Sequence, residues 1–223
     1  MLCSTEGIVF SFIKFKESSI ITKIYTKDLG LKSYIVNGVR SNKSSKIALF
    51  QPLSLLSLVV YNKANVQLNR ISELKCQDPF LDIRSNNSKI FISIFISEIL
   101  SKTIKEEATD EDLYYFIKNS LIVLDELKGN FNNYHLIFLA KLSQYLGFNT
   151  SSSSELLSCC TEIFTQEEKR ILEEILNCSY QSDIIIPNYI RKKILKTLLQ
   201  FYYYNIDSMP EIKSAKVLEE VLN

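Results

Sequence analysis

The sequence of 223 residues predicts an α+β protein with an N-terminal five-stranded barrel followed by an all-helical C-terminal domain. Short β-rich runs separated by turn residues fill the chain up to residue 78, and from residue 79 onward apolar residues recur with helical spacing. The charge changes at the same place, because the residues up to Phe80 carry 11 Lys/Arg and 5 Asp/Glu, whereas the remainder carry 15 and 20. We therefore expect a basic domain at residues 1–78, suited to a polyanion, and an acidic helical domain at residues 79–223.

Five β-rich segments are expected in the first domain, separated by turns such as Lys27-Asp28-Leu29-Gly30, in which Gly30 can adopt a positive φ. Five short strands at close spacing fit a small barrel or sandwich, and five is the count of the oligonucleotide/oligosaccharide-binding (OB) barrel. The expected strands are Ile8–Phe15, Ser19–Thr26, Leu31–Asn37, Leu53–Tyr61 and Val66–Leu74.

Helices are expected throughout the second domain, after a turn-rich stretch at 77–87. The first is apolar around most of its circumference, which is typical of a central buried helix, and on it Glu98 can pair with Lys102 one turn later. Thr165 and Glu168 have the spacing of a capping box, and a serine-rich loop is expected at 150–158. The expected helices are 88–105, 110–127, 133–146, 169–176, 189–204 and 213–222.

The sequence argues against secreted and membrane proteins. No basic and apolar leader begins the chain, and the most apolar window, 90–100, is too short and too polar to span a bilayer. The five cysteines are an odd and scattered set, which favours reduced thiols in the cytoplasm. Cys159 and Cys160 are adjacent and Cys178 stands alone, so the paired spacing of a zinc site is missing. We expect a cytoplasmic protein without a bound metal.

No constellation of catalytic residues is evident. His135 is the single histidine, and there is no Gly-x-x-x-x-Gly-Lys phosphate loop. Asp110, Glu111 and Asp112 could hold the metal of a nuclease, but the helix macrodipole also favours acidic residues in a first helical turn. We favour the second interpretation and expect no catalytic residue and no cofactor.

Basic residues alternate with aromatic ones in the first domain, a pattern typical of proteins that bind single-stranded nucleic acid. Phe15 lies between two lysines, and Tyr25 and Tyr34 each share a strand face with the lysine two positions earlier. The alternative is that these aromatics are barrel core and the lysines ordinary surface. The chain has 21 Lys and 5 Arg, which favours phosphate contacts over the reading of base edges. The expected DNA-binding residues are Lys14, Lys16, Lys23, Lys32, Arg40, Lys43 and Lys46.

A second basic cluster follows Pro187 on an expected helix. It is either a solvated helix face or one side of a groove for an acidic peptide that ends in a hydrophobic residue. The cluster consists of Arg191, Lys192, Lys193 and Lys196.

A series of short motifs, each present once, follows a fixed order along nearly the whole chain, and the most specific of them are in the first domain. They are Thr5-Glu6-Gly7-Ile8-Val9, Lys16-Glu17-Ser18-Ser19-Ile20-Ile21, Tyr25-Thr26-Lys27-Asp28-Leu29-Gly30-Leu31, Gly38-Val39-Arg40-Ser41, Phe50-Gln51-Pro52-Leu53, Ser97-Glu98-Ile99-Leu100, Leu146-Gly147-Phe148 and Lys213-Ser214-Ala215-Lys216-Val217-Leu218. In this order they resemble the RecO family of recombination mediators.

The resemblance implies an N-terminal OB barrel, a helical C-terminal domain and a non-enzymatic role in DNA repair. Proteins of this kind bind single- and double-stranded DNA, anneal complementary strands and bind the acidic C-terminal tail of single-strand-binding protein (SSB). With RecR they help RecA onto SSB-coated gaps in the RecF pathway, at the bacterial nucleoid. Arg40 is the first DNA contact that the resemblance implies, followed by Lys43 and Lys46. The alternative is a protein-interaction adaptor of the repair machinery that does not bind DNA.

The sequence departs from the family pattern in one place. Many relatives carry a four-cysteine zinc module after the Leu-Gly-aromatic helix end, where this chain has Thr150 to Ser154 and then Cys159-Cys160. We therefore expect that zinc has been lost, together with any contact that such a module makes.

Overall fold

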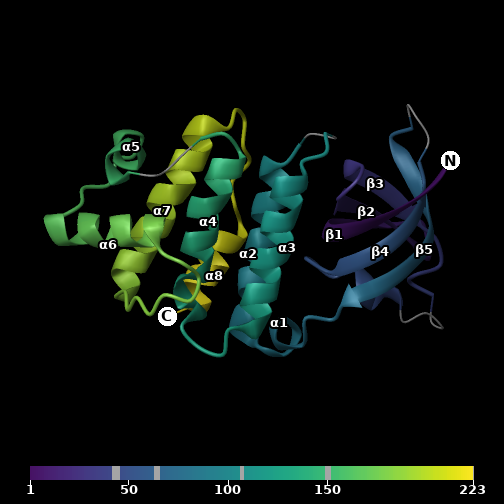
Figure 1. Ribbon diagram of the computed structural model, residues 1–223, viewed down its shortest axis with the longest axis horizontal. Helices are drawn as coiled ribbons and strands as arrows, with labels where there is room; N and C mark the ends of the chain where they lie inside the picture. The colour runs from purple at the N-terminus through teal and green to yellow at the C-terminus, as the bar shows by residue number, and fades with distance from the viewer. Residues whose placement is uncertain (42–45, 63–65, 106–107, 149–151, 223) are drawn as a thin grey trace.

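The computed structural model describes residues 1–41, 46–62, 66–105, 108–148 and 152–222. A β-barrel forms one end of the molecule and helices form the other, so the predicted α+β class is confirmed (Figure 1). The strands are β1 (Leu2–Phe15), β2 (Ser19–Thr26), β3 (Gly30–Val36), β4 (Leu55–Tyr61) and β5 (Leu68–Asp78), with the 3-10 turn η1 (Lys46–Phe50) before β4.

The strands close into a barrel in the order β1-β2-β3-β5-β4. All neighbouring pairs are antiparallel except β3 and β5, which pair in parallel from Ser33–Leu68 to Ile35–Arg70. A closed five-stranded barrel with this crossover is the OB barrel that the strand count predicts.

Two strands are longer than the sequence indicated. β1 begins at Leu2, because Leu2 to Ile8 pairs with β4 before the second half of the strand pairs with β2. β5 continues to Asp78 because its last residues pair with the start of β4. Both extensions contain polar residues, and long-range pairing rather than local apolar alternation holds them in the sheet.

Gly7 lies where β1 passes closest to its neighbours inside the barrel. A Cβ atom at this position would lie 2.6 Å from the Cγ2 atom of Ile24 and 3.0 Å from Cδ1 of Leu58. Only glycine leaves room for these two core side chains, so the Thr-Glu-Gly motif near the N-terminus has a packing role.

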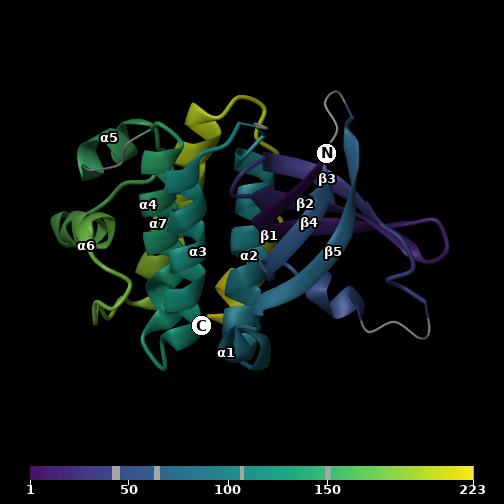
Figure 2. The ribbon, with the colours of Figure 1, turned by 45° about the vertical axis from the view of Figure 1, so that its right-hand side comes forward.

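The hydrophobic core is divided between the barrel interior and the helices. The interior is filled by side chains such as Val9, Ile24 and Leu58. Ile8 and Tyr25 project from the outer face of the barrel and join the core of the helical domain. The barrel is therefore fixed against the helices by a shared apolar interface. Figure 2 shows the barrel beside α2 from a second direction.

The helical domain places α2 and α3 beside the barrel, and α5 and α6 farthest from it (Figure 1). Its helices are α1 (Leu81–Ser85), α2 (Asn87–Thr103), α3 (Glu111–Glu126), α4 (Tyr134–Tyr145), α5 (Ser153–Ser158), α6 (Gln166–Asn177), α7 (Asn188–Asn205) and α8 (Ser214–Val221), with the 3-10 turn η2 (Phe131–Asn133) before α4. None of the helices in the described part of the chain has the length and apolar character needed to cross a membrane.

Two predictions of irregular structure were wrong. The stretch at 77–87 includes the last residues of β5 and helix α1, and the serine-rich segment includes helix α5. In α5 the Ser152 side chain accepts a hydrogen bond from the backbone of Glu155, and Leu156 is fully buried. Serine at the N-cap therefore starts this helix, although a serine-rich composition by itself indicates a loop.

Two local predictions are confirmed. Thr165 and Glu168 form the capping box of α6, each side chain bonded to the other residue's backbone amide. Glu98 accepts a hydrogen bond from Lys102 at 2.5 Å, and it also accepts hydrogen bonds from the backbone amide and the hydroxyl of Ser214. Glu98 therefore connects the central helix α2 to the first turn of α8.

Candidate nucleic-acid interface

Basic side chains gather at the end of the barrel that carries the β1–β2 turn. Lys14 and Lys16 are exposed there, and the Lys16 ammonium lies 5.5 Å from the centre of the Phe15 ring. Lys16 has a positive φ of 50°, which turns the chain sharply between the two strands. The turn therefore presents two cations and a half-buried ring on a hairpin that projects from the barrel (Figure 2).

Arg40 lies against the same turn. Its backbone amide donates to the Ser18 carbonyl at 3.0 Å, and its Nη1 donates to the carbonyls of Lys16 at 3.1 Å and Ser19 at 3.5 Å. The guanidinium therefore fixes the conformation of the hairpin as well as adding charge to it. Lys46 is exposed at the start of η1, and Lys43 lies outside the described residues.

The other two expected DNA contacts are separated along the strands. Lys23 is exposed on the outer face of β2, between Ser11 and Ser33. Lys32 pairs with Ile24 and lies toward the β2–β3 turn, at the opposite end of β2 from Lys16. The structure therefore brings Lys14, Lys16 and Arg40 together, with Lys23 farther along the same sheet, and it leaves Lys32 apart.

Tyr25 and Tyr34 are buried, so neither can stack on a nucleic-acid base. Tyr25 lies under the helices, stacks on Phe10 at 5.7 Å and donates its hydroxyl to the Asp110 carbonyl at 3.2 Å. Tyr34 belongs to the core inside the barrel. Burial raises the pKa of each tyrosine to about 12. The interpretation of these two rings as barrel and interface core is therefore the correct one.

Two further exposed residues on the barrel are brought together by the strand register and are not singled out by any sequence pattern. Arg70 in β5 pairs with Tyr61 in β4, and both side chains are exposed. Arg70 also pairs with Ile35 across the parallel β3–β5 ladder. No local pattern could join these positions, because the crossover that makes β5 a neighbour of β3 is a property of the closed barrel.

A hollow on another side of the barrel carries mixed charge. Glu6, Asp28 and Glu73 line it together with Lys27 and Lys75. Three carboxylates would repel a phosphate backbone, so this hollow does not extend the basic surface.

Three of the four basic residues on α7 have partners within the helical domain. The guanidinium of Arg191 donates to the Leu222 carbonyl at 2.8 Å, to the Ile186 carbonyl at 3.1 Å and to the Asn133 side chain at 3.1 Å. Lys193 pairs with Glu168 at 2.7 Å, and Lys196 pairs with Glu162 at 2.5 Å. These contacts give Arg191 and Lys193 structural roles. Lys196 is the exposed member of the cluster, and Lys192 is half-buried, as Arg191 and Lys193 are.

A groove between α3 and α4 is rich in aromatic side chains. The rings of Phe116 and Tyr145 stack at 4.5 Å, and the Lys141 ammonium lies 5.9 Å from the centre of the Tyr180 ring. Tyr115 and Tyr145 are partly exposed along this groove, whose volume is about 570 Å³. Asp112 also lines the groove, so its rings lie beside one lysine and one carboxylate. Apolar rings beside a lysine can hold a hydrophobic residue that carries a carboxylate.

Three of the residues considered as catalytic or metal-binding candidates, His135, Asp110 and Glu111, have structural explanations. His135 is fully buried, and burial lowers its pKa to about 3, so it stays neutral. Asp110 caps α3 by accepting the Leu113 amide at 2.9 Å, and Glu111 pairs with Lys27. Within the described residues no three His, Cys, Asp or Glu side chains gather as metal ligands would.

Comparisons with known proteins bear on both domains. The model of the recombination protein O N-terminal domain matches residues 1–80, and that of the recombination protein O C-terminal domain matches residues 84–163. The chain is 34% identical to the DNA repair protein RecO of Flavobacterium psychrophilum and 32% identical to that of Flavobacterium johnsoniae, in alignments that cover both chains fully. The corresponding protein of Bacteroides fragilis is 29% identical over its full length.

The chain belongs to the RecO family. Membership gives it a role in DNA repair, and it confirms the resemblance that the motifs carry. The basic hairpin and Arg40 lie within the segment that matches the RecO N-terminal domain, whereas α6, α7 and α8 lie beyond the segment that matches the RecO C-terminal domain.

Proposed function

We propose that this RecO family protein is a non-enzymatic mediator of DNA repair and recombination at the bacterial nucleoid. Its barrel binds single- and double-stranded DNA and anneals complementary strands. Together with SSB and RecR, the protein helps RecA to load at single-stranded gaps in the RecF pathway. The observation that carries the proposal is the cluster of Lys14, Lys16 and Arg40 on the projecting β1–β2 hairpin.

Annealing by this surface needs no active site. Lysine and arginine side chains neutralise phosphates and so reduce the repulsion between two strands. Lysines contact phosphates as point charges and do not select a base sequence, so the bases stay available to search for their complements. Lys43 and Lys46 follow Arg40 in the chain, and Lys46 adds an exposed cation at the start of η1.

The helical domain is the proposed site for the SSB tail, an acidic peptide with a hydrophobic end. Because Arg191, Lys193 and Lys196 are engaged within the domain, Lys192 is the member of that cluster best placed to meet such a peptide. The aromatic groove beside Lys141 has the more suitable chemistry, since it offers rings to a hydrophobic residue and an ammonium to its carboxylate. Tail binding that is lost on Lys141→Glu and retained on Lys192→Glu would assign the groove.

Binding of a labelled single-stranded oligonucleotide over a range of salt concentrations tests the function. If ~4–6 phosphates are engaged, log affinity should fall with log salt at a slope of about −3 to −4. An adaptor that does not bind DNA would show no salt-dependent association, and that result would contradict the proposal.

A further inference from the structure

An apolar groove lies in the helical domain between α6 and the segment that leads into α7. Its volume is about 620 Å³. Ile171 of α6 lines one wall, and Ile184, Ile185, Tyr189 and Ile190 line the other. Ile185 is 94% exposed and Tyr189 is 67% exposed, so two large apolar side chains stand in solvent beside the hollow. Apolar side chains that gather around a groove mark an interaction site, and these five residues are termed the distal groove.

The second wall of the distal groove is held in place by hydrogen bonds from the rest of the helical domain. The Ile184 carbonyl accepts a hydrogen bond from the Asn133 side chain at 2.7 Å, and the Ile186 carbonyl accepts one from Nη2 of Arg191 at 3.1 Å. Ile186 is buried in the core, whereas Ile185, between these two anchors, is exposed. The exposure of Ile185 is therefore a fixed feature of the surface. A wall that is already ordered loses little conformational entropy when a partner binds.

Carboxylates stand on both walls of the distal groove. Glu167 and Glu174 share one face of α6 with the apolar residue of that wall, because they lie four residues before it and three residues after it. Asp183 lies on the opposite wall. Arg170 is the exposed cation of the lining, and Glu168 is buried and already paired with a lysine. The exposed lining therefore carries three carboxylates against one guanidinium.

This arrangement of charge identifies the chemistry of the partner. An apolar floor between two acidic walls complements a helix whose apolar stripe has Lys or Arg on both sides. DNA and acidic peptides are disfavoured, because the same carboxylates repel them. α6 lies at the end of the molecule opposite the barrel, so a partner seated beside it leaves the basic hairpin open (Figure 1).

We infer that the distal groove binds a basic amphipathic helix of a partner protein. The apolar stripe of this helix packs on Ile185 and Tyr189. Its flanking cations meet Glu167 and Glu174 on one wall and Asp183 on the other. The inference goes beyond the proposed function, since it concerns a surface for a further protein and involves neither DNA nor the SSB tail.

Binding of a labelled synthetic peptide of about 15 residues tests the inference. The peptide has leucine at helical spacings of three and four and lysine elsewhere, and a control peptide has glutamate in place of lysine. The variant Ile185→Ser/Tyr189→Ser removes the exposed apolar side chains and no charge. Its matched control is Tyr204→Ser/Val217→Ser, which changes residues that are 71% and 43% exposed elsewhere on the helical domain.

A second pair of variants tests the carboxylates. Glu167→Gln/Glu174→Gln neutralises the α6 wall of the groove. Its matched control is Glu126→Gln/Asp207→Asn, which makes the same change of charge at exposed carboxylates that do not line the groove. Thermal unfolding of all the variants checks that the helical domain remains folded.

The wild type should bind the lysine peptide as a saturable one-to-one complex and the glutamate peptide at least about tenfold more weakly. Ile185→Ser/Tyr189→Ser should weaken binding about tenfold both at low salt and at about 1 M salt, because salt does not screen apolar contacts. Glu167→Gln/Glu174→Gln should weaken binding about threefold at low salt and less at about 1 M, where the Debye length is ~3 Å. The conservative variant Ile185→Val/Tyr189→Phe and both matched controls should bind as the wild type does.

Unchanged affinity for the lysine peptide in either groove variant would overturn the inference, and so would equal losses in the matched controls. Sedimentation velocity tests the other occupant, which is the basic hairpin of a second copy of this chain. The wild type should sediment as a monomer at every concentration. Self-association that Glu167→Gln/Glu174→Gln abolishes would assign the groove to a second copy and overturn the inference. The groove variants leave the barrel unchanged, so the DNA-binding tests of the proposed function are decided separately.

Discussion

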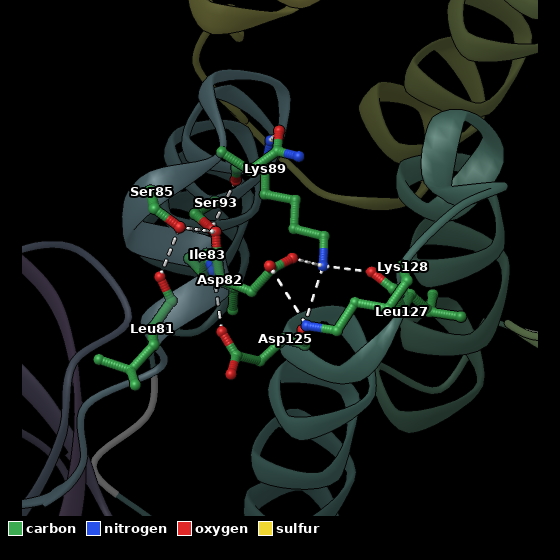
Figure 3. Close-up of polar contacts among 10 residues, drawn as sticks. Leu81, Asp82, Ile83, Ser85, Lys89, Ser93, Asp125, Leu127 and Lys128 are labelled. Carbon is green, nitrogen blue, oxygen red and sulfur yellow. Dashed lines mark hydrogen bonds and ion pairs between the residues drawn. The ribbon is translucent and has the colours of Figure 1, made fainter.

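The Nζ atom of Lys89 lies 2.5 Å from the Oδ2 atom of Asp82, and no part of the Lys89 side chain reaches solvent (Figure 3). The same ammonium donates to the carbonyls of Leu127 at 2.5 Å and Asp125 at 3.1 Å, at the end of α3. Lys89 therefore joins α1, α2 and α3. Because Arg84 on α1 donates to the Ser54 hydroxyl of the barrel at 2.7 Å, this buried charge also helps to hold the two domains in one orientation.

Removal of the Asp82 charge should destabilise the protein. Asp82→Asn leaves the buried ammonium without its carboxylate, and a cost of ~1–3 kcal/mol is expected because two carbonyls still solvate it. The control is Glu211→Gln, which removes the carboxylate of an exposed pair with Lys216 and should cost at most ~0.5 kcal/mol. Urea denaturation measures both values, and equal stabilities for the two variants would contradict the importance of the buried pair.

Glu98 should make stability depend on pH in the acid range. Partial burial opposes its ionisation, but hydrogen bonds from Lys102 and from Ser214 outweigh this effect and lower its pKa to about 2, from an ordinary value of 4.5. The folded state therefore binds a proton less readily than the unfolded state. The resulting stability is complete above about pH 4.5 and is lost as the pH falls toward 2.

The variant Glu98→Gln isolates this contribution. It should lower stability at pH 7 by roughly 1–2 kcal/mol, after allowance for solvent screening, and by less at pH 3. Denaturation curves at the two pH values give the difference. A destabilisation that is the same at both pH values would show that the charge of Glu98 does not contribute.

Lys23 should contact phosphate without supporting the fold. Its side chain is exposed on β2, so Lys23→Ala should reduce the magnitude of the single-strand salt slope by about 0.7 and leave the unfolding temperature unchanged. Lys216→Ala, on the acidic helical domain, should leave the slope as it is. A Lys23→Ala slope identical to the wild type would exclude this residue from the DNA interface.

Zinc should be absent from the purified protein. Cys159 and Cys160 are half-buried, the Cys160 thiol donates to the Thr197 carbonyl at 3.3 Å, and burial raises the pKa of that thiol to about 11. A thiol that stays protonated is a poor metal ligand. Elemental analysis should therefore find no stoichiometric zinc, and a chelator should not change the unfolding temperature. Stoichiometric zinc would overturn this interpretation of the cysteines.

Much of the fold could be predicted because it depends on local sequence. The central parts of all five strands follow from β-rich runs between turn residues, and the start of α6 follows from the spacing of Thr165 and Glu168. The polar ends of β1 and β5 could not be predicted, since pairing with β4 stabilises them. Helix α5 was missed because serine favours both loops and N-caps.

The basic character of the candidate site could be predicted from the sequence, but not which of its side chains are exposed. Because side chains two residues apart in a strand share a face, Lys23 and Tyr25 were correctly predicted to lie on one face. The helices, however, cover Tyr25 and leave Lys23 exposed. The cluster on α7 contains Arg191, whose role in joining α7 to residues near 133, 186 and 222 depends on helix packing. Exposure and partners of this kind arise from tertiary contacts, which periodicity does not encode.

The most direct test of the central claim is the annealing of complementary oligonucleotides, with and without an SSB coat. The wild type should accelerate annealing in both cases, and Arg40→Glu/Lys43→Glu/Lys46→Glu should lose at least about tenfold of that rate because each reversal adds repulsion for phosphate. The control Lys169→Glu/Lys213→Glu/Lys216→Glu makes the same change of charge on the helical domain and should anneal as the wild type does. Annealing at the wild-type rate by the folded Arg40, Lys43 and Lys46 variant would contradict the claim that this end of the barrel binds DNA.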